Sequence, residues 1–317
     1  MHIEIVDGIP DGLDEFCVSS PTATFYQTSS WLEPLSHWLT SMDVRCLVAT
    51  KADEVVGYLP FFVRRRGPFE AMWSNPLGTY GGPVARTDNE FKQLAEHFFE
   101  LRKAKNVFEV GLVDFGNRVD STGVHKEENT THILQLTPDF ETLWSDAFEK
   151  SKRRQTRKAI REGLTVSEAR THDDVRAYYA IYRSRIAAWQ QRICLPESLF
   201  LNLFDRKNVK LFLAFLDKTL LGGHMNFYFG DAVIAWNGVT SEDSRGVQAS
   251  TLLYSKCIEH ACENGFTSYN LGASLGKPSL IEYKEAIGGE LYSYRSLTWR
   301  SRGARVASRV LRTFRGS

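Results

Sequence analysis

The chain has 317 residues, of which 43% are hydrophobic and 24% charged, and its 39 Lys and Arg against 38 Asp and Glu give a formal net charge of +1. This composition is globular, which excludes a disordered or collagen-like chain, and the length allows two domains. The balanced charge argues against a histone-like nucleic-acid binder, and no apolar run approaches the roughly 20 residues that a membrane helix needs.

The N-terminal stretch MHIEIVDGIPDGLDEF carries acids where a secretory signal would carry Lys or Arg. We therefore expect a cytoplasmic protein. The five cysteines are odd in number and widely spaced, and the sequence contains no CxxC and no HxxxH. This pattern predicts neither a disulfide framework nor a metal site.

In chain order, strands are predicted near residues 2–6, 44–50, 55–65, 107–112 and 131–136, with helices near 30–40 and 88–105. The second half opens with helices near 140–162, 172–191 and 197–206 and continues with strands near 209–216, 220–229 and 231–239. It closes with a helix at 248–264, a strand at 267–271, a helix at 278–286 and a strand at 290–298. Helices that feed an antiparallel meander and then one βαβ unit indicate an α/β protein of mixed α+β character. We expect domains at 1–138 and 139–299, with residues 300–317 as a tail.

Two segments have the same pattern at an offset of 165 residues. Residues 44–57 read VRCLVATKADEVVG and residues 209–222 read VKLFLAFLDKTLLG, so that Gly57 matches Gly222. Each segment predicts a β-hairpin. Any two hairpins look alike, but predicted helices precede and follow both of these in the same order. We interpret the pattern as an internal duplication.

The second half runs from AWNGVTSEDSRGVQAS through an apolar helix to SYNLG and SLIEYKEAIGGE. This order resembles the acetyltransferase fold of the GNAT superfamily. Nearly the whole chain resembles the FemAB-like family, in which two such folds are fused. The motifs that carry this resemblance are Gln27 with Trp31, Gly81-Gly82-Pro83, the basic segment KSKRRQTRKAIREG, and Tyr283-Lys284 with Gly288. The resemblance implies two tandem GNAT-like acyltransferase domains, each with a mixed, mostly antiparallel sheet flanked by helices.

The resemblance also implies a donor site at the turn before the apolar helix, formed by Arg245, Gly246, Val247, Gln248, Ala249 and Ser250. In GNAT enzymes the matching turn binds the pyrophosphate of coenzyme A, because a helix N-terminus offers free N–H groups and a partial positive charge. Gln248 stands where that motif has its first glycine, and Ser250 where it has glycine or alanine. The alternative interpretation is an ordinary capped turn.

Catalytic roles are implied for Lys284 and Tyr283. Acyl transfer to an amine passes through a tetrahedral oxyanion, which a fixed cation stabilises. Lys284 would supply that cation or hold the donor, and Tyr283 would protonate the leaving group, unless Lys284 is simply a solvated helix lysine. Asn237 is expected to contact the substrate. Glu242, Asp243 or a water would accept the amine proton.

The basic segment predicts a helix whose cations bind substrate phosphates, with Arg153, Arg154, Arg157 and Lys158 as the candidates. No acid lies between Glu149 and Glu162, and such a stripe suits a nucleotide-sugar, a lipid pyrophosphate or a tRNA end. A plain solvated face is the alternative. The arginine-rich tail, residues 300–317, predicts a short amphipathic helix at the inner face of an anionic membrane, or a disordered or RNA-contacting tail.

Together these features predict an N-acyltransferase that acts on an amine of a cell-envelope or polysaccharide precursor, either a small molecule or lipid-linked, as in peptidoglycan synthesis. The donor would be acyl-CoA or aminoacyl-tRNA, used as a co-substrate, with no permanently bound cofactor. DNA is not expected as a partner. The alternative is a non-catalytic scaffold that binds an acidic or phosphorylated partner, since a fold does not fix a function.

Overall fold

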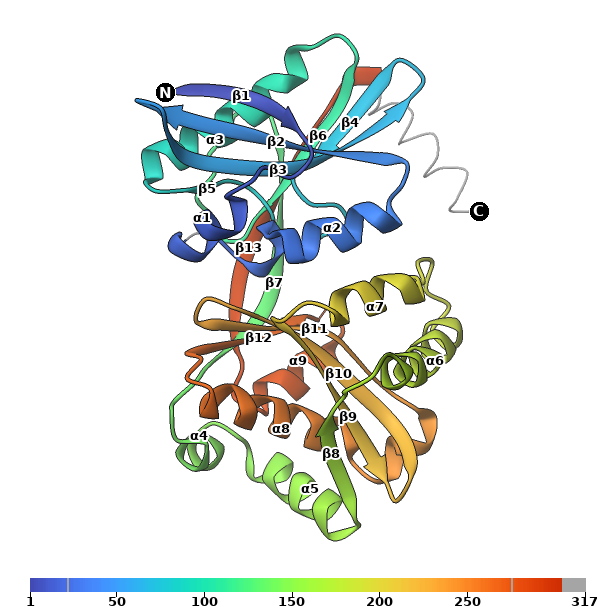
Figure 1. The fold of residues 1–317 in the computed structure, drawn as a ribbon. Helices are drawn as coiled ribbons and strands as arrows, with labels where there is room; N and C mark the ends of the chain where they lie inside the picture. The colour runs from blue at the N-terminus through green and yellow to red at the C-terminus, as the bar shows by residue number, and fades with distance from the viewer. Residues whose placement is uncertain (22, 275, 304–317) are drawn as a thin grey trace. The chain divides into compact units, whose positions relative to one another are not determined.

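The computed structural model describes residues 1–303 apart from residues 22 and 275 (Figure 1). The chain divides into two compact units. Unit 1 comprises Met1–Asn129 together with the residues from Ser293 onward, and unit 2 comprises Thr130–Tyr292. Residues 304–317 lie outside the described residues, so the predicted amphipathic tail stays a prediction.

The division between the units differs from the boundaries expected at residues 138 and 299, because both crossings lie inside strands. β7 (His125–Gln135) begins in unit 1 and pairs with unit 2 from Thr131 onward. β13 (Glu290–Arg300) begins in unit 2 and pairs with unit 1 from Arg295 onward. A continuous strand carries no turn signal, so the sequence offers no break at these points.

Unit 1 is built on a sheet with the strand order β1-β2-β3-β4-β6-β13, with the short β5 also paired to β3. β4 and β6 pair in parallel. The strands are β1 (His2–Asp7), β2 (Met42–Lys51), β3 (Glu54–Arg66), β4 (Phe69–Trp73), β5 (Val84–Ala85), β6 (Val107–Asp114) and β13. The helices are α1 (Leu13–Ser19), α2 (Ser29–Trp38) and α3 (Asp88–Glu100), with 3-10 turns at Phe25–Gln27 and Leu101–Lys103.

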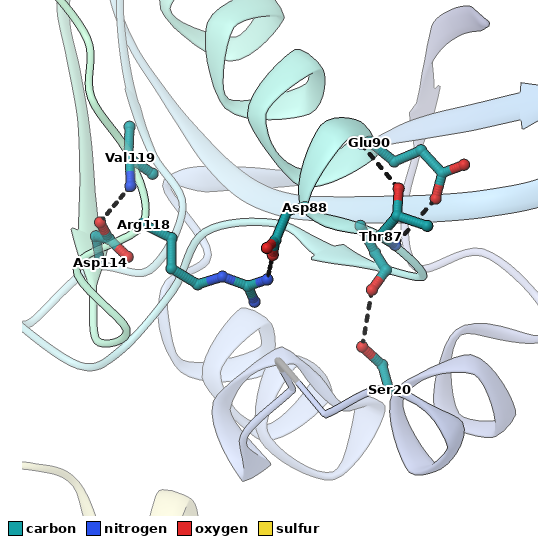
Figure 2. Close-up of polar contacts among 8 residues, drawn as sticks. Ser20, Thr87, Asp88, Glu90, Asp114, Arg118 and Val119 are labelled. Atoms are coloured by element: carbon teal, nitrogen blue, oxygen red, sulfur yellow. Dashed lines mark hydrogen bonds and ion pairs between the residues drawn. The ribbon is translucent and has the colours of Figure 1, made fainter.

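Helix α3 covers one face of this sheet (Figure 1). Its N-terminus is fixed by a capping box, in which Thr87 and Glu90 bond each other's backbone N–H groups (Figure 2). Figure 2 also shows Arg118 paired with Asp88, next to the bond from the Val119 N–H to the Asp114 carboxylate. Apolar side chains of α3, such as Phe98, pack against β2 and β3. Burial of each one contributes roughly 1.5–3 kcal/mol to the stability of the folded state.

Gln27 and Trp31, two of the motif residues of unit 1, form hydrogen bonds within the fold. The Gln27 side chain accepts hydrogen bonds from the backbone N–H and the hydroxyl of Thr24, at 2.9 and 2.6 Å. The Trp31 indole donates to Asn75 Oδ1 at 3.2 Å, and the Asn75 amide donates to the carbonyls of Tyr26 and Tyr80. These bonds close the connection between β4 and β5 and satisfy the buried polar groups.

Unit 2 has a sheet with the order β7-β12-β11-β10-β9-β8, in which β11 and β12 pair in parallel. The strands after β7 are β8 (Leu164–Glu168), β9 (Val209–Leu216), β10 (Thr219–Phe229), β11 (Ala232–Thr240) and β12 (Ser268–Ala273). The helices are α4 (Phe140–Asp146), α5 (Lys150–Arg161), α6 (His172–Ala188), α7 (Glu197–Phe204), α8 (Ala249–Glu263) and α9 (Pro278–Glu285), with a short 3-10 helix, η3 (Glu242–Gly246).

Helix α8 packs on one face of this sheet, and α5 packs on α8 (Figure 1). The opposite face is covered by α6 and α7, where the rings of Tyr178, Phe200 and Trp236 meet. The helix predicted at 140–162 is two helices, because the chain turns at residues 147–149. There the Glu149 N–H bonds to the carbonyl of Ala286 rather than continuing a helix.

The predicted mixed α/β class is confirmed, and most predicted elements are present. Sequence reasoning missed α1, β4, β5 and β8, which are short and lack the long apolar pattern on which strand and helix prediction depends. Among residues 1–303, leaving out 22 and 275, no helix is both long and apolar enough to cross a membrane.

The 165-residue offset is kept in the register of the two hairpins. Ala49 lies opposite Gly57 in unit 1, and Ala214 lies opposite Gly222 in unit 2. In each hairpin the residue before this glycine is a bulge without a partner on the neighbouring strand. A Cβ on Gly57 would lie 2.6 Å from the Leu94 side chain, and one on Gly222 would lie 2.6 Å from Thr240 Cα. Neither position therefore has room for a side chain.

Candidate active site

The sheet of unit 2 opens between two of its strands. β11 and β12 pair only at Ala232 with Ser268, Val233 with Tyr269 and Ile234 with Asn270. Within the described part of the chain these strands share no further pairing, although β11 continues to Thr240 and β12 to Ala273. The register of β12 with β7 also shifts after Asn270. At this end the two strands are not paired with each other, so their backbone groups take partners from elsewhere.

The predicted donor turn lies at the N-terminus of α8. Gln248 is the N-cap residue, has a left-handed backbone with φ 61°, and makes no side-chain capping bond. This conformation is the one that glycine adopts freely, which explains why the related motif has glycine at this position. The first N–H groups of an α-helix have no partner within the helix. This end of α8 can therefore bind an anion.

The basic helix α5 lies beside this turn. The Lys158 ammonium donates to the carbonyl of Gly246 at 3.2 Å, and the Lys152 ammonium lies 4.1 Å from the ring centroid of Tyr283. Burial lowers the pKa of Lys152. Of the other predicted phosphate-binding residues, Arg153 donates to the carbonyl of Ser145, and Arg154 and Arg157 are exposed. The fold thus brings the basic helix and the predicted donor turn together.

Tyr283 and Lys284 point to different places. The Tyr283 hydroxyl lies 3.5 Å from Thr251 Oγ1 in the first turn of α8, and burial raises its pKa. The Lys284 ammonium donates to the carbonyls of Gly272 and Ala273 at 2.5 and 3.0 Å, at the end of β12 where the sheet has opened. The two neighbours therefore connect α9 to both parts of the candidate site.

Lys284 is only 2% exposed, so it is not the solvated helix lysine of the alternative interpretation. Burial lowers its pKa from 10.5 to about 8. Gly288, with φ 89°, closes α9, because the N–H groups of Gly288 and Gly289 bond to the carbonyls of Glu285 and Lys284. This is the helix-ending role of a left-handed glycine, and it accounts for the spacing between Lys284 and Gly288.

A buried polar network on β10 was missed by sequence reasoning. His224 Nδ1 lies 2.9 Å from Asn226 Oδ1, which also accepts a 2.6 Å bond from the Tyr269 hydroxyl. The Asn226 amide donates to the carbonyl of His224 and to Cys257 Sγ. Two polar residues at alternate positions of the apolar run LLGGHMNFYF were the available signal, because they share one face of the strand.

His132 on β7 is a second buried imidazole. It is fully buried, and neither ring nitrogen has a hydrogen-bond partner in the described part of the chain. Its pKa is lowered by burial and then by the charge of Lys284, while the Glu285 carboxylate, 3.9 Å from Nε2, opposes the shift. A buried polar group without a hydrogen bond lowers the stability of the folded protein, so His132 is expected to destabilise the fold.

The remaining predicted residues have other partners. The Tyr178 hydroxyl donates a shared hydrogen bond to Asn237, 2.6 Å from its side-chain Oδ1 and 3.0 Å from its backbone oxygen, on the face covered by α6. Glu242 is paired with Arg185 at 2.6 Å, whereas Asp243 is exposed. These contacts do not bring Asn237 to Lys284. Among residues 1–303, with 22 and 275 left out, no cluster of three or more His, Cys, Asp or Glu could hold a metal ion.

Unit 1 contains a cavity of about 390 Å³ with different chemistry. Its only charged lining residue among those described is Arg64, whose guanidinium stacks 5.0 Å over Trp73. The other lining side chains are apolar or neutral, and no His, Cys, Asp or Glu lines the described wall. The described wall of this cavity therefore offers no side chain that exchanges a proton near neutral pH.

One family of known proteins matches part of unit 2. Residues 147–285, all within unit 2, match the family model of the acetyltransferase (GNAT) domain. This match includes the donor turn and both Tyr283 and Lys284. A search of curated proteins gave no match.

The whole chain is similar in fold to several solved structures. FemX matches with a TM-score of 0.72 at 15% identity, over 92% of this chain and 96% of FemX. L-PGS from Bacillus licheniformis matches with a TM-score of 0.59 at 12% identity, over 93% and 94% of the two chains. A tandem GNAT protein from the clavulanic acid biosynthesis pathway matches with a TM-score of 0.54 at 13% identity, over 94% and 98%. The predicted architecture of two tandem GNAT-like folds is confirmed.

Proposed function

We propose that this chain is an acyltransferase that transfers an acyl or aminoacyl group onto an amine of a cell-envelope or polysaccharide precursor. The match of residues 147–285 to the acetyltransferase (GNAT) domain model and the similarity in fold to FemX support this proposal. The similarity in fold to FemX and L-PGS supports an acceptor from the cell envelope, with peptidoglycan precursors as one class. The observation that carries the proposal is the buried Lys284 ammonium at the open end of the β11–β12 pair, with the N-terminus of α8 linked to the same helix through Tyr283.

The donor's phosphates bind at the N-terminus of α8. Its free N–H groups, the partial positive charge of the helix and the ammonium groups of Lys152 and Lys158 all favour an anion there. The exposed Arg154 and Arg157 extend the positive surface along α5. Arg245, Gly246, Val247, Gln248, Ala249 and Ser250 form the turn that contacts these phosphates in this proposal.

The acyl carbonyl enters the opening between β11 and β12. The acceptor amine attacks the carbonyl carbon, an N–C bond forms, and negative charge develops on the carbonyl oxygen. A charged lysine has three N–H donors, and two of those on Lys284 are bonded to backbone carbonyls, which leaves the third for this oxyanion.

The C–S or C–O bond to the leaving group then breaks, and the proton lost by the amine balances the proton that the leaving group gains. A tyrosine is protonated at neutral pH, and burial raises the pKa of Tyr283 further, so its hydroxyl is present to donate to the leaving atom. Glu242, Asp243 or water accepts the amine proton. Holding the two reactants together supplies much of the rate, so no covalent enzyme intermediate is needed.

Two donors fit this site. Acyl-CoA is the donor that the GNAT family match favours. Two features favour aminoacyl-tRNA. The surface of α5 is basic, and Gln248 stands where the related motif has glycine, so that its side chain hinders close contact between the backbone and a pyrophosphate. Acetyl-CoA titration by calorimetry, run beside transfer from labelled aminoacyl-tRNA, separates the two.

Each outcome of this comparison has a definite meaning. Saturable heat with acetyl-CoA that is lost in Lys158→Ala supports acyl-CoA. Transfer from aminoacyl-tRNA without acetyl-CoA binding supports the second donor. If neither donor binds or reacts, the proposed transfer is wrong, whatever the fold.

A further inference from the structure

The polar residues His224 and Asn226 stand where unit 1 has apolar residues. In unit 1 Leu47 pairs with Leu59, and in unit 2 Phe212 pairs with His224, at the same offset of 165. The same offset relates Phe61 to Asn226. Leu59 and Phe61 are fully buried against α3, so the shared hairpin needs no polar group at these positions.

The network fixes which nitrogen of His224 carries the proton. Asn226 Oδ1 is a pure acceptor, and the Asn226 amide already donates to the carbonyl of His224 and to Cys257. His224 Nδ1 must therefore donate to Asn226, which leaves Nε2 as an unprotonated acceptor. Among the described residues His224 makes no hydrogen bond through Nε2.

His224 lies at the open end of the sheet. Its ring edge rests against Gly238 on β11, four residues beyond the last residue that pairs with β12. A Cβ on Gly238 would lie 2.6 Å from Nε2, so only glycine leaves room for the ring. Gly238 is exposed, whereas His224 is 3% exposed. The unbonded lone pair thus lies beneath a backbone segment that reaches the surface.

The surroundings disfavour a second proton on this ring. The ring packs against Tyr254, with centroids 4.6 Å apart, and Tyr254 in turn packs against Tyr283. Burial and the charge of Lys284 lower the pKa of His224 to about 4. The same charge repels an incoming ammonium ion. A neutral N–H donor is the group that suits both the lone pair and the neighbouring cation.

We infer that His224 Nε2 accepts a hydrogen bond from the neutral amine of the acceptor and so orients the nucleophile toward the acyl carbonyl. This inference rests on the proposed function and names the residue that recognises the nucleophile. The amine's own lone pair stays free for attack, because the amine uses an N–H group to bind the imidazole.

The direct test follows the imidazole nitrogens of the full chain, labelled with ¹⁵N-histidine, by NMR. The His224 signals are assigned by their loss in His224→Gln. We expect the Nδ1–H tautomer in the free protein, and a saturable shift of Nε2 on adding D-glucosamine but not D-glucose at a pH of about 7.5, where part of this amine is neutral. An Nε2–H tautomer, or an Nε2 signal that D-glucosamine does not move, overturns the inference. This readout needs no turnover, so it remains informative if the proposed transfer fails.

A pair of variants separates recognition from structure. His224→Asn keeps a polar group near Asn226 but removes the acceptor at the Nε2 position, whereas His224→Gln keeps an acceptor there and loses the bond to Asn226. In the transfer assay with whichever donor reacts, we expect kcat/KM to fall at least 10-fold further in His224→Asn than in His224→Gln. The reverse order indicates a purely structural role for His224 and contradicts the inference.

Discussion

Units 1 and 2 repeat one plan, yet the faces that their central hairpins present to the covering helix differ in chemistry. Unit 1 packs Leu59 and Phe61 against α3, whereas unit 2 places His224 and Asn226 at the matching register positions beneath α8. Apolar packing supports the plan by itself, as unit 1 demonstrates. The polar face of unit 2 is therefore unnecessary for the fold, and this points to a role in function.

A second difference lies on the strand that pairs with β6 in unit 1 and on the strand that pairs with β12 in unit 2. In unit 1, Leu297 on β13 lies opposite Leu112 and is fully buried. In unit 2, the unsatisfied His132 lies on β7, where the register with β12 shifts. Residues 115–124, which follow β6, form no helix, whereas α9 follows β12 and delivers Lys284. The buried imidazoles of His132 and His224 and the buried ammonium of Lys284 thus all lie in unit 2.

The largest expected effect comes from giving unit 1 the polarity of unit 2. Phe61→Asn should lower the free energy of unfolding by about 4 kcal/mol or more, because it leaves a cavity and buries an amide without partners. Urea unfolding measures this loss. Phe69→Asn is the control. Phe69 is an exposed residue at the start of β4, so this change should alter stability by less than about 1 kcal/mol. Equal effects at both positions would contradict the view that unit 1 requires an apolar face.

Removing the buried ammonium group of Lys284 should have the next largest effect. Lys284→Met should lower kcat by roughly 10²–10³-fold, because the oxyanion loses its charged donor. Initial rates of transfer measure the change, and Lys277→Met, an exposed lysine beside the same helix, should keep full activity. A folded Lys284→Met protein with near-normal turnover would remove Lys284 from the mechanism.

The same residue predicts a pH limit. The wild-type rate should fall as pH rises past about 8, where Lys284 loses its proton. In Lys284→Arg, whose guanidinium stays charged, any remaining activity should lack this limb. A basic limb that persists unchanged in Lys284→Arg would assign it to another group.

A smaller effect sharpens the contrast between His224 and Leu59. Because the folded pKa of His224 is about 4 and the unfolded value is 6.5, the unfolded chain binds the extra proton as pH falls between them. This group should therefore remove stability on the order of 3 kcal/mol over that window, with none lost above pH 6.5. Urea midpoints from pH 7 to 4 should decline less steeply in His224→Leu. Parallel curves for the two proteins would contradict the prediction.

The smallest effect concerns His132. His132→Leu should raise the free energy of unfolding by about 1 kcal/mol, because it removes two unsatisfied buried nitrogens and supplies the residue type that unit 1 has at this edge. His260→Leu is the control, since the His260 ring is bonded to Tyr228 and its loss should not stabilise the protein. Destabilisation by His132→Leu would mean that a bound water or ligand satisfies this imidazole.

By itself the sequence determined the order of elements, the duplicated hairpin, the basic helix and the Tyr283-Lys284 pair. These features are local patterns of period, charge and glycine spacing, which act over a few residues. Gly57 and Gly222 could be matched from sequence because both sit at the same point of a two-strand pattern.

Only the tertiary structure decided which polar residues meet. His224, Asn226, Tyr269 and Cys257 come from three separate elements, and their contact depends on strand register and on which face α8 covers. Likewise Asn237 was expected at the substrate, but the register of β11 turns it toward Tyr178. For the same reason the sequence did not show that β7 and β13 pass from one unit to the other. The point of passage is set by the strands with which each pairs, and these are distant in the chain.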